Sequence, residues 1–568
     1  MKSDPPIRGS AIEILASIQN DRLLIQDFRP LAESIEWELG QLYWEERGSR
    51  AFISDDVPFT INNDGNLSKN AAEVLFVNLL ESERNGMLES QIRVLEIGIG
   101  TGLFARYFLD AFQALCHQYD KDYYQKLCYI AADQSESMLA DAEKHGIFSN
   151  HPDRYQLKII NALDPALALD ALDIAQQYPL RAVFLNYVLD TLPASVLQVN
   201  DNQIKQLCIR TRLARGVNLS EYTSLSFADI VRKAAATSQY DKRELVDLYS
   251  LFALDYAYRE VDLHAIPYGD FVVSFARSHA SRCILNNHGA LRCIECLLKK
   301  LNDKGFILIN DYGYRHKDDP AEVYLHQRFS GSTAIGLNFD FLRFYLEESK
   351  QVCWLEPTED NTHIYTRLLI RRPMPQTTTR FDECFRKTTY DWIYQPAELA
   401  RGYVNEGNYD AALGAYRQAI ERQPRNPVLL EEISRCLTYD FRDYEAGLEL
   451  ARIGLDLNPI SPGLWNIFGD NLYYLGRIEE AHDAFLRALE LNPVDVRSRY
   501  NLIYTYTDRK DYASALAMIT EGLFHDKTGE YRERFLEKQT EILARLRQLD
   551  QQRNHIFKNR FNQFNRVS

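Results

Sequence analysis

The sequence predicts an α/β domain built on a parallel sheet, followed by an all-α repeat domain. Three observations support this prediction. Short apolar runs alternate with helical patterns through residues 94–370, which is typical of a doubly wound sheet. A glycine-rich turn, "EIGIGTG", ends the first of these runs. From Gln395 onward, proline, glycine and alanine recur with the period of a helical-hairpin repeat.

Length and composition restrict the class of protein. A chain of 568 residues is too long for one core, so two or three domains are expected. The net charge of −15 argues against a general nucleic-acid binder. No apolar run reaches about 18 residues and the start "MKSDPPIRGS" has no apolar signal core, so we expect a cytoplasmic protein without a membrane segment.

The nine cysteines are scattered, which predicts reduced thiols. Cys293 and Cys296 form a C-x-x-C on an amphipathic helix with no second pair nearby, so we expect no metal site. Nothing in the sequence indicates the oligomeric state.

The glycine turn lies between a strand ending at Ile97 and a helix beginning at Leu103. A phosphate-binding P-loop would end in Gly-Lys-Ser/Thr, and a dinucleotide fingerprint would need glycine where Leu103 stands. The carboxylate of Glu96 at the strand tip suits an ammonium group and repels pyrophosphate. The alternative is an ordinary glycine-rich turn in a phosphate-binding domain. The glycines concerned are Gly98, Gly100 and Gly102.

A second strand, residues 127–132, ends at Asp133. A carboxylate at this place accepts from both hydroxyls of a ribose, although Asp133 could instead cap the helix that follows. The third strand ends at Asn161, a polar residue of the kind that lies against an adenine edge.

The fourth predicted strand ends at Asn186 and continues as a polar segment through Asp190 to Pro193. The fifth ends at Asp311, and a helix and a hairpin of strands follow. In such sheets ligands bind at the carboxyl ends of the strands. Five polar side chains fall at that edge: Glu96, Asp133, Asn161, Asn186 and Asp311.

The pattern E-x-G-x-G-x-G resembles motif I of the Rossmann-like S-adenosylmethionine methyltransferases. The segments "LNYVLDTLPASVLQVNDNQIKQLCIRT" and "ILINDYGY" are similar to the N-E-x-x-D-x-x-P segment and the Asp-Tyr-Gly strand of the MidA-like methyltransferases. The resemblance covers residues 35–372 and implies methyl transfer from S-adenosyl-L-methionine. Because the mitochondrial member methylates an arginine of a respiratory complex I subunit, protein arginine methylation is also implied.

The resemblance implies a role for each candidate residue. Glu96 and the three glycines would hold the methionine part of the cofactor, with Asp133 at the ribose, Asn161 on the adenine side and Asn186 beside them. Asp190 and Asp311 would orient the acceptor and receive its proton. Tyr187 stands where the family has glutamate, and it offers a hydroxyl or a stacking surface.

Two other functions remain open. A scaffold that keeps the methyltransferase fold without turnover is favoured by Tyr187. A small-molecule methyltransferase is the second alternative, with the long, mostly helical insertion at about 200–290 as its lid.

The second half of the chain repeats. Pro424, Pro459 and Pro493 are 35 and 34 residues apart, which is the period of tetratricopeptide repeats. Stacks of such repeats bind a protein or peptide in a groove. We therefore expect a methyltransferase domain at 1–375, a linker at 376–394, the repeats at 395–550 and a basic tail at 551–568.

Overall fold

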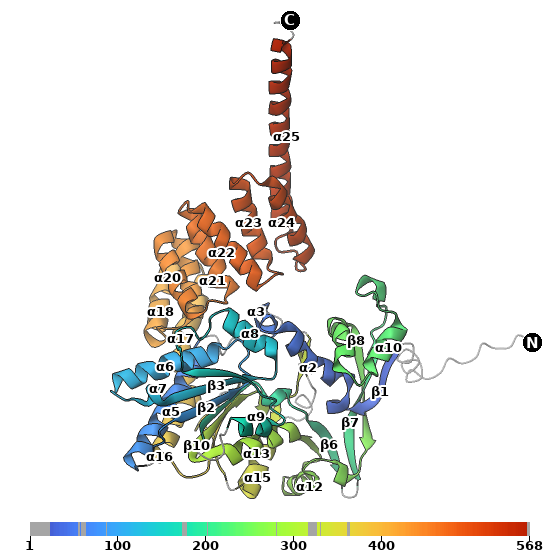
Figure 1. The fold of residues 1–568 in the computed structure, drawn as a ribbon, viewed down its shortest axis with the longest axis vertical. Coiled ribbons are helices and arrows are strands. Elements are labelled where there is room, and N and C mark those ends of the chain that lie inside the picture. Colours follow the sequence, from blue (N-terminus) through green and yellow to red (C-terminus); the bar gives the residue numbers. More distant parts are fainter. Residues whose placement is uncertain are drawn as a thin grey trace, which may run out of the picture. The chain divides into compact units, whose positions relative to one another are not determined.

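The computed structural model describes residues 23–54, 57, 64–86, 88–172, 179–200, 203–279, 281–315, 327–329, 331–350, 352–360 and 364–564 (Figure 1). The chain divides into two compact units. The first comprises Met1–Ala51, Asp56–Pro58 and Leu67–Tyr390, and the second comprises Phe52–Asp55, Phe59–Asn66 and Asp391–Ser568.

The first unit is built on a seven-stranded sheet with the order β15-β16-β10-β5-β2-β3-β4. The five strands from β10 to β4 in this order are parallel, while β16 runs antiparallel to β10 and β15 antiparallel to β16. This confirms the α/β fold, with each predicted strand in place. The strands are β2 (Ile92–Ile97), β3 (Leu127–Asp133), β4 (Tyr155–Ile159), β5 (Leu180–Asn186), β10 (Leu301–Asp311), β15 (Cys353–Leu355) and β16 (Tyr365–Ile370).

Helices cover both faces of this sheet (Figure 1). On one face, Phe108 of α6 (Leu103–Gln118) contacts the rings of Tyr129 and Phe184, and α5 (Asn66–Arg84) packs against α6. The other face forms an apolar core with α9 (Pro165–Ala171), α12 (Gly269–Ser278), α13 (His288–Lys300) and α15 (Phe339–Lys350). Strands buried on both faces explain the continuous apolar runs.

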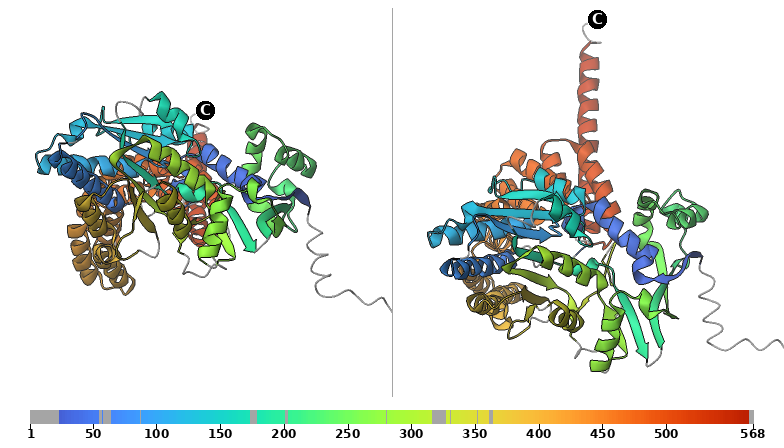
Figure 2. Two further views of the ribbon diagram at one scale, coloured as in Figure 1. Left: turned by 90° about the horizontal axis from the view of Figure 1, so that it is seen from below. Right: turned by 60° about the horizontal axis from the view of Figure 1, so that its bottom comes forward.

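The insertion between β5 and β10 is a mixed structure, which corrects the prediction that it is mostly helical. A separate five-stranded sheet is centred on β7 (Figure 2). β1 and β6 pair with one edge of β7, β8 pairs with its other edge, and β9 pairs with β6. The segment "QIKQLCIRTRL" forms the long strand β7, whose side chains are mostly buried, with Gln203 exposed at its start. From the insertion come β6 (Ser195–Asn200), β7 (Gln203–Leu213), α10 (Phe227–Ala234), β8 (Phe252–Glu260) and β9 (Cys283–Asn286). The remaining strand of the sheet, β1 (Leu24–Pro30), comes from the N-terminal part of the chain.

Further elements complete the first unit, and α3 (Arg50–Ile53) spans the division between the two units. The further elements are η1 (Leu31–Glu33), α2 (Ile35–Arg47), α7 (Tyr123–Lys126), α8 (Glu136–Lys144), η2 (Leu189–Thr191), η3 (Leu219–Glu221), α11 (Gln239–Lys242), η4 (Arg243–Leu251), η5 (Leu263–Ala265), β11 (Gly313–Tyr314), β12 (Gln327–Phe329), β13 (Ser332–Ala334) and β14 (Leu337–Asn338).

The segment predicted as a linker, residues 376–394, is helical instead. It consists of α16 (Pro375–Phe385) and the start of α17 (Lys387–Asn405). Pro375 occupies the first turn of α16, where proline is well tolerated. The backbone N–H and hydroxyl of Thr377 both donate to Glu81 of α5, at 3.0 and 2.9 Å. This segment is therefore part of the first unit as far as Tyr390.

The second unit consists of helical hairpins, as the repeat period predicts. Gly469 shows why small residues recur, because a Cβ there would lie 2.5 Å from the ring of Phe485. Within the described ranges, no helix has the length and apolarity that a bilayer span needs. The further helices are α18 (Tyr409–Arg422), α19 (Pro427–Cys436), the π-helix η6 (Leu437–Phe441), α20 (Tyr444–Leu457), α21 (Pro462–Tyr474), α22 (Ile478–Leu491), α23 (Val496–Asp508), α24 (Tyr512–His525) and α25 (Arg532–Phe564).

We predict that a fragment of residues 1–386 melts at a higher temperature than a fragment of residues 1–374. Only the longer fragment keeps α16, which buries Phe381 and satisfies the buried carboxylate of Glu81. Losing hydrogen bonds to a charged group costs about 1.5–3 kcal/mol, so Tm should fall by at least about 2 °C. Differential scanning calorimetry measures the difference, and equal melting temperatures would show that α16 is not part of the first unit.

Candidate functional site

The register of the parallel strands brings three polar side chains to one face of the sheet. Val94 pairs with Tyr129, so Glu96, two residues further along β2, shares a face with Tyr129. Glu96 also pairs with Phe184, which places Asn186 at the end of β5 on that same face. Since side chains alternate along a strand, these three residues meet beneath the glycine turn.

Glu96 is a buried carboxyl group with 1% exposure. The hydroxyl of Tyr129 donates to its Oε2 at 2.8 Å. Burial raises the pKa of Glu96 to about 8, the charge of Asp133 adds to this, and the hydrogen bond from Tyr129 only partly offsets it. A cation beside this carboxyl group would favour its ionised form.

The glycine turn depends on backbone angles that other residues rarely adopt. Gly98, Gly100 and Gly102 have φ angles of +77°, +52° and +78°. The backbone N–H groups of Gly98 and Ile99 donate to the carbonyl of Ala132 at 2.8 and 3.2 Å, which ties the turn to β3. A Cβ on Gly98 would lie 3.2 Å from the side chain of Val188, so the turn is also close to the segment after β5.

Asp133 connects the glycine turn to the next helix. Its carboxylate accepts from the backbone N–H of Ser135 at 2.9 Å and of Gly100 at 3.4 Å. Burial raises its pKa to about 6. Ser135, not Asp133, is the N-cap of α8, because its side chain accepts from the N–H of Met138. The ribose role of Asp133 stays a prediction.

Asn161 lies apart from these residues, in the turn after β4 at the edge of the sheet. It is exposed, and its side-chain carbonyl accepts from the N–H of Leu163 at 2.8 Å. The contact closes a local turn, so its adenine role also stays a prediction.

Asp190 and Asp311 form a buried pair at the ends of β5 and β10, with 5% and 0% exposure. Asp311 accepts from three backbone N–H groups, those of Leu189 (3.0 Å), Asp190 (3.3 Å) and Tyr312 (2.8 Å). Oδ1 of Asp190, in contrast, is buried without a hydrogen-bond partner among the described residues. Asp311 is thus hydrogen-bonded to the backbone, whereas Asp190 has one oxygen that accepts no hydrogen bond from the described residues.

Burial and mutual proximity raise the pKa of both carboxyl groups. Burial raises the pKa of Asp190 to about 7. Burial and then the charge of Asp190 raise the pKa of Asp311 well above its usual value. Because two buried carboxylates in contact cannot both ionise readily, the pair holds a proton near neutral pH.

Tyr187 and Tyr312 form an aromatic pair beside these carboxyl groups, with ring centroids 5.2 Å apart. Tyr187 has a φ angle of +55°, a strained conformation for a non-glycine residue, and its backbone N–H donates to the carbonyl of Asn310 at 2.9 Å. The Asn310 amide in turn donates to Asn186 at 2.8 Å. This polar contact connects the segment around Tyr187 to the residues around Glu96.

Sequence reasoning missed Tyr129, Asn310 and Tyr312. The signal for Tyr129 and Asn310 was the register itself, since both stand at positions that share the face of Glu96 and Asn186. Tyr312 follows Asp311 directly, and only the positive φ angle of Tyr187 brings the two rings together.

Two parts of the chain match known protein families. Residues 72–334, which include every candidate residue above, match the family described as "Putative S-adenosyl-L-methionine-dependent methyltransferase". Residues 398–463 and 468–522 match the tetratricopeptide repeat family. A protein of Burkholderia thailandensis solved with bound S-adenosyl-homocysteine is 14% identical, with a TM-score of 0.38, over 62% of this chain and 81% of that chain.

Curated relatives are similar over shorter stretches. The peroxisomal targeting signal receptor of Candida glabrata is 33% identical over 148 residues, 25% of each chain. The BBSome complex member BBS4 of Bos taurus is 26% identical over 166 residues, which are 23% of this chain and 32% of that protein. This chain therefore spans about a quarter to a third of the length of these relatives.

The residues present fit the cofactor that the family uses. Burial raises the pKa of the Glu96 carboxyl group, and an α-ammonium group beside it would favour its ionised form. The turn of three left-handed glycines brings backbone close to any ligand at the strand ends.

We predict that Glu96→Gln stabilises the protein without ligand at alkaline pH. In the unfolded chain Glu96 ionises near its usual value of 4.5, but in the folded chain only near 8. The free energy of unfolding therefore falls as pH rises from about 4.5 to about 8, by about 1.4 kcal/mol per unit of pKa shift. Glutamine does not ionise, so the variant does not lose this stability.

Melting curves at pH 5 and pH 8.5 measure this effect. The Glu96→Gln variant should match the wild type at pH 5 and melt at least about 2 °C higher at pH 8.5. Glu143→Gln, an exposed substitution in α8, is the control. A Glu96→Gln variant that gains nothing at pH 8.5 would contradict the raised pKa.

We predict that Gly98→Ala weakens binding of S-adenosyl-L-methionine at least tenfold. Alanine is strained at a φ angle of +77°, and its Cβ would displace the turn from Val188. Gly216→Ala is the matched control, because Gly216 has a φ angle of +79° with open space around it. Titration calorimetry compares the variants, and equal affinity of Gly98→Ala and wild type would remove the turn from the binding site.

Proposed function

Because residues 72–334 belong to the S-adenosyl-L-methionine-dependent methyltransferases, we propose that the chain methylates a nitrogen of a protein side chain that its repeats recruit. The observation that carries this proposal is Asp190, a buried carboxyl group with an unpartnered oxygen beside an aromatic pair. A cationic or other nitrogen-bearing side chain would donate a hydrogen bond to this oxygen.

The residues divide the work of the reaction. When bound, S-adenosyl-L-methionine supplies a methyl group on a sulfonium centre. Glu96, the glycine turn and Asp133 would hold it at the carboxyl ends of β2 and β3. Methyl transfer is an in-line displacement, so most of the acceleration comes from positioning the acceptor.

Asp190 would orient the acceptor nitrogen and accept its proton at Oδ1. A base works best when its pKa is near the working pH, and the pKa of Asp190 is about 7. Asp311 has a different part, because its oxygens already accept three backbone N–H groups. It positions the segment that carries Asp190, and the rings of Tyr187 and Tyr312 would flank a cationic acceptor.

An arginine acceptor is supported by the aromatic pair and the carboxyl pair together. A guanidinium group stacks on aromatic rings and pairs with carboxylates. Tyr187 in place of the family's glutamate removes one carboxylate, so Asp190 would be the single available acceptor of its N–H groups.

We predict that Asp190→Asn and Asp311→Asn fail in different ways. Asp190→Asn should slow methyl transfer at least about tenfold, equivalent to about 1.4 kcal/mol, with little change in Tm. Asp311→Asn should lower the free energy of unfolding by about 1–3 kcal/mol, because an amide cannot accept all three backbone N–H groups. Asp241→Asn, an exposed substitution, is the control.

Transfer of tritiated methyl to lysate proteins, followed by acid hydrolysis, measures the rates and identifies the modified residue. Methylated arginine in the hydrolysate would establish the acceptor. Label in small molecules alone would favour the small-molecule alternative. A wild-type protein that binds the cofactor and transfers no label would favour the scaffold, and Asp190→Asn at the wild-type rate would exclude Asp190 as the base.

A further inference from the structure

A pocket of about 460 Å³ lies within the repeats, between α21, α23 and α25 and the π-helix η6. Six tyrosines line it, from η6, α21, α23 and the turn before α25: Tyr439, Tyr473, Tyr474, Tyr500, Tyr504 and Tyr531. Two arginines, Arg497 and Arg534, and one carboxylate, Asp470, supply its charges. Tyrosine and arginine are the residues that protein interfaces use most as anchors.

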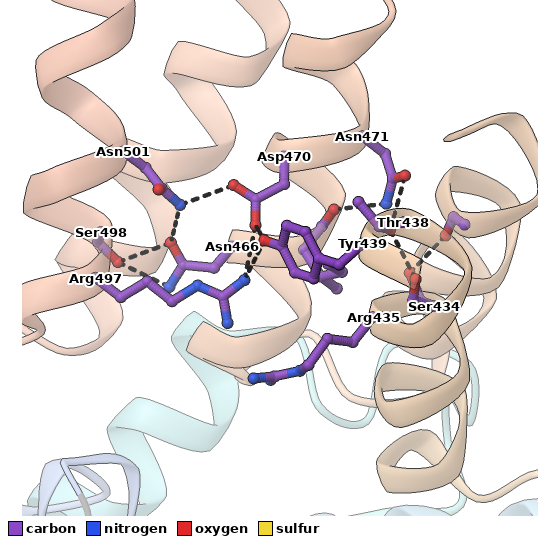
Figure 3. A network of polar contacts seen from close by, with 12 residues as sticks. Ser434, Arg435, Thr438, Tyr439, Asn466, Asp470, Asn471, Arg497, Ser498 and Asn501 are labelled. Atoms are coloured by element: carbon purple, nitrogen blue, oxygen red, sulfur yellow. Dashed lines mark hydrogen bonds and ion pairs between the residues drawn. The ribbon is translucent and has the colours of Figure 1, made fainter. Parts of the chain in front are cut away.

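The π-helix accounts for one wall of this pocket. Pro427, Pro462 and Val496 begin α19, α21 and α23, which are equivalent helices of successive repeats. The first two starts are 35 residues apart and the last two are 34 apart, so the repeat that begins with α19 has one extra residue. The extra residue is accommodated where α19 widens into η6 and ends at Arg442, with a φ angle of +57°. Such single turns occur often at functional sites. Here the turn carries Tyr439, whose side chain contacts α21 and α23 (Figure 3).

The negative charge in the pocket is already satisfied. Asp470 accepts from Arg497 at 2.7 Å, from Asn501 at 2.9 Å and from the hydroxyl of Tyr439 (Figure 3). It is 7% exposed. Because Arg497 neutralises it, Asp470 has no oxygen left for a cationic ligand.

The positive charge, in contrast, is in excess. Arg534 is exposed on α25, and its guanidinium lies 5.2 Å from the ring of Tyr531. No hydrogen bond or ion pair joins Arg534 to another of the described residues. With Arg497 paired to Asp470, the lining residues include one uncompensated cation. The Tyr439 hydroxyl is bonded to Asp470 and those of Tyr500 and Tyr504 to each other, so Tyr474 and Tyr531 are the other phenolic donors of the lining.

We propose that this pocket binds a carboxylate of an acidic peptide segment in the protein that the repeats recruit. The proposal rests on the recruiting role given to the repeats above. Arg534 would pair with the carboxylate, tyrosine hydroxyls would donate to it, and the rings would pack against neighbouring side chains. A nucleic acid fits less well, because binding a run of phosphates takes several cations and the pocket has one that is uncompensated.

The test uses the full-length protein and random heptapeptides on beads, made as C-terminal amides and as free acids. The tightest binders are resynthesised with a fluorophore, and their affinity is measured by fluorescence anisotropy without S-adenosyl-L-methionine. Selected sequences should be rich in Asp and Glu or require the free C-terminus. Binding by amides identifies a side-chain carboxylate, and binding by acids alone identifies a terminal one.

Arg534→Glu should weaken the selected peptides at least tenfold, as should Glu→Gln and Asp→Asn exchanges in the peptides. Arg547→Glu, the same charge reversal at an exposed position of α25, should change affinity less than twofold. Circular dichroism confirms that both variants keep their helices. Basic or neutral consensus peptides, no enrichment, or an Arg534→Glu variant that binds as well as wild type would each overturn the proposal.

The outcome is separable from the fate of the proposed methyl transfer. Asp190→Asn should bind the selected peptides as wild type does, and Arg534→Glu should bind S-adenosyl-L-methionine as wild type does. Loss of peptide binding in Arg534→Glu together with a wild-type protein that transfers no methyl would keep this pocket and refute the enzyme.

Discussion

The site depends on one buried carboxylate, that of Asp311. It accepts the backbone N–H groups of Leu189 and Asp190, which follow β5, and of Tyr312, which follows β10. These bonds hold the segment after β5 against the end of β10. Val188 in that segment is then close to Gly98, so the glycine turn and the pair of Asp190 and Asp311 are held in one arrangement. Burying this carboxyl group carries a desolvation cost, which the three backbone donors reduce but do not cancel, since its pKa stays well above the usual value.

The sequence alone could predict the parallel sheet and the residues at its carboxyl edge. Apolar runs that end in Glu96, Asp133, Asn186 and Asp311 correspond to β2, β3, β5 and β10. This works because a strand buried on both faces leaves a continuous apolar signature, and because ligands bind where such strands end. The repeats were equally predictable, since a small residue such as Gly469 must recur where helices approach closely.

The remaining features depend on contacts that no local pattern contains. The strand β7 alternates only weakly, and its partners β1 and β8 lie far away in the chain. The "PMPQTTT" segment has the composition of a linker, but Glu81 of α5 converts it into a docked helix. Asp311 accepts hydrogen bonds from backbone N–H groups, whereas Oδ1 of Asp190 has no partner among the described residues. The sequence alone does not predict this difference, because it depends on the path of the folded backbone.

The long insertion between β5 and β10 has a consequence for the order in which the sheet assembles. Glu96 and Tyr129, on β2 and β3, are 33 residues apart in the chain, whereas Asn186 and Asn310, on β5 and β10, are 124 apart. Closing the longer loop costs roughly 1.2 kcal/mol more chain entropy, at about 0.6 kcal/mol per doubling of length. Non-local strand pairing is slow for this reason. Refolding should therefore complete the half of the sheet beneath the glycine turn before Asp190 and Asp311 meet.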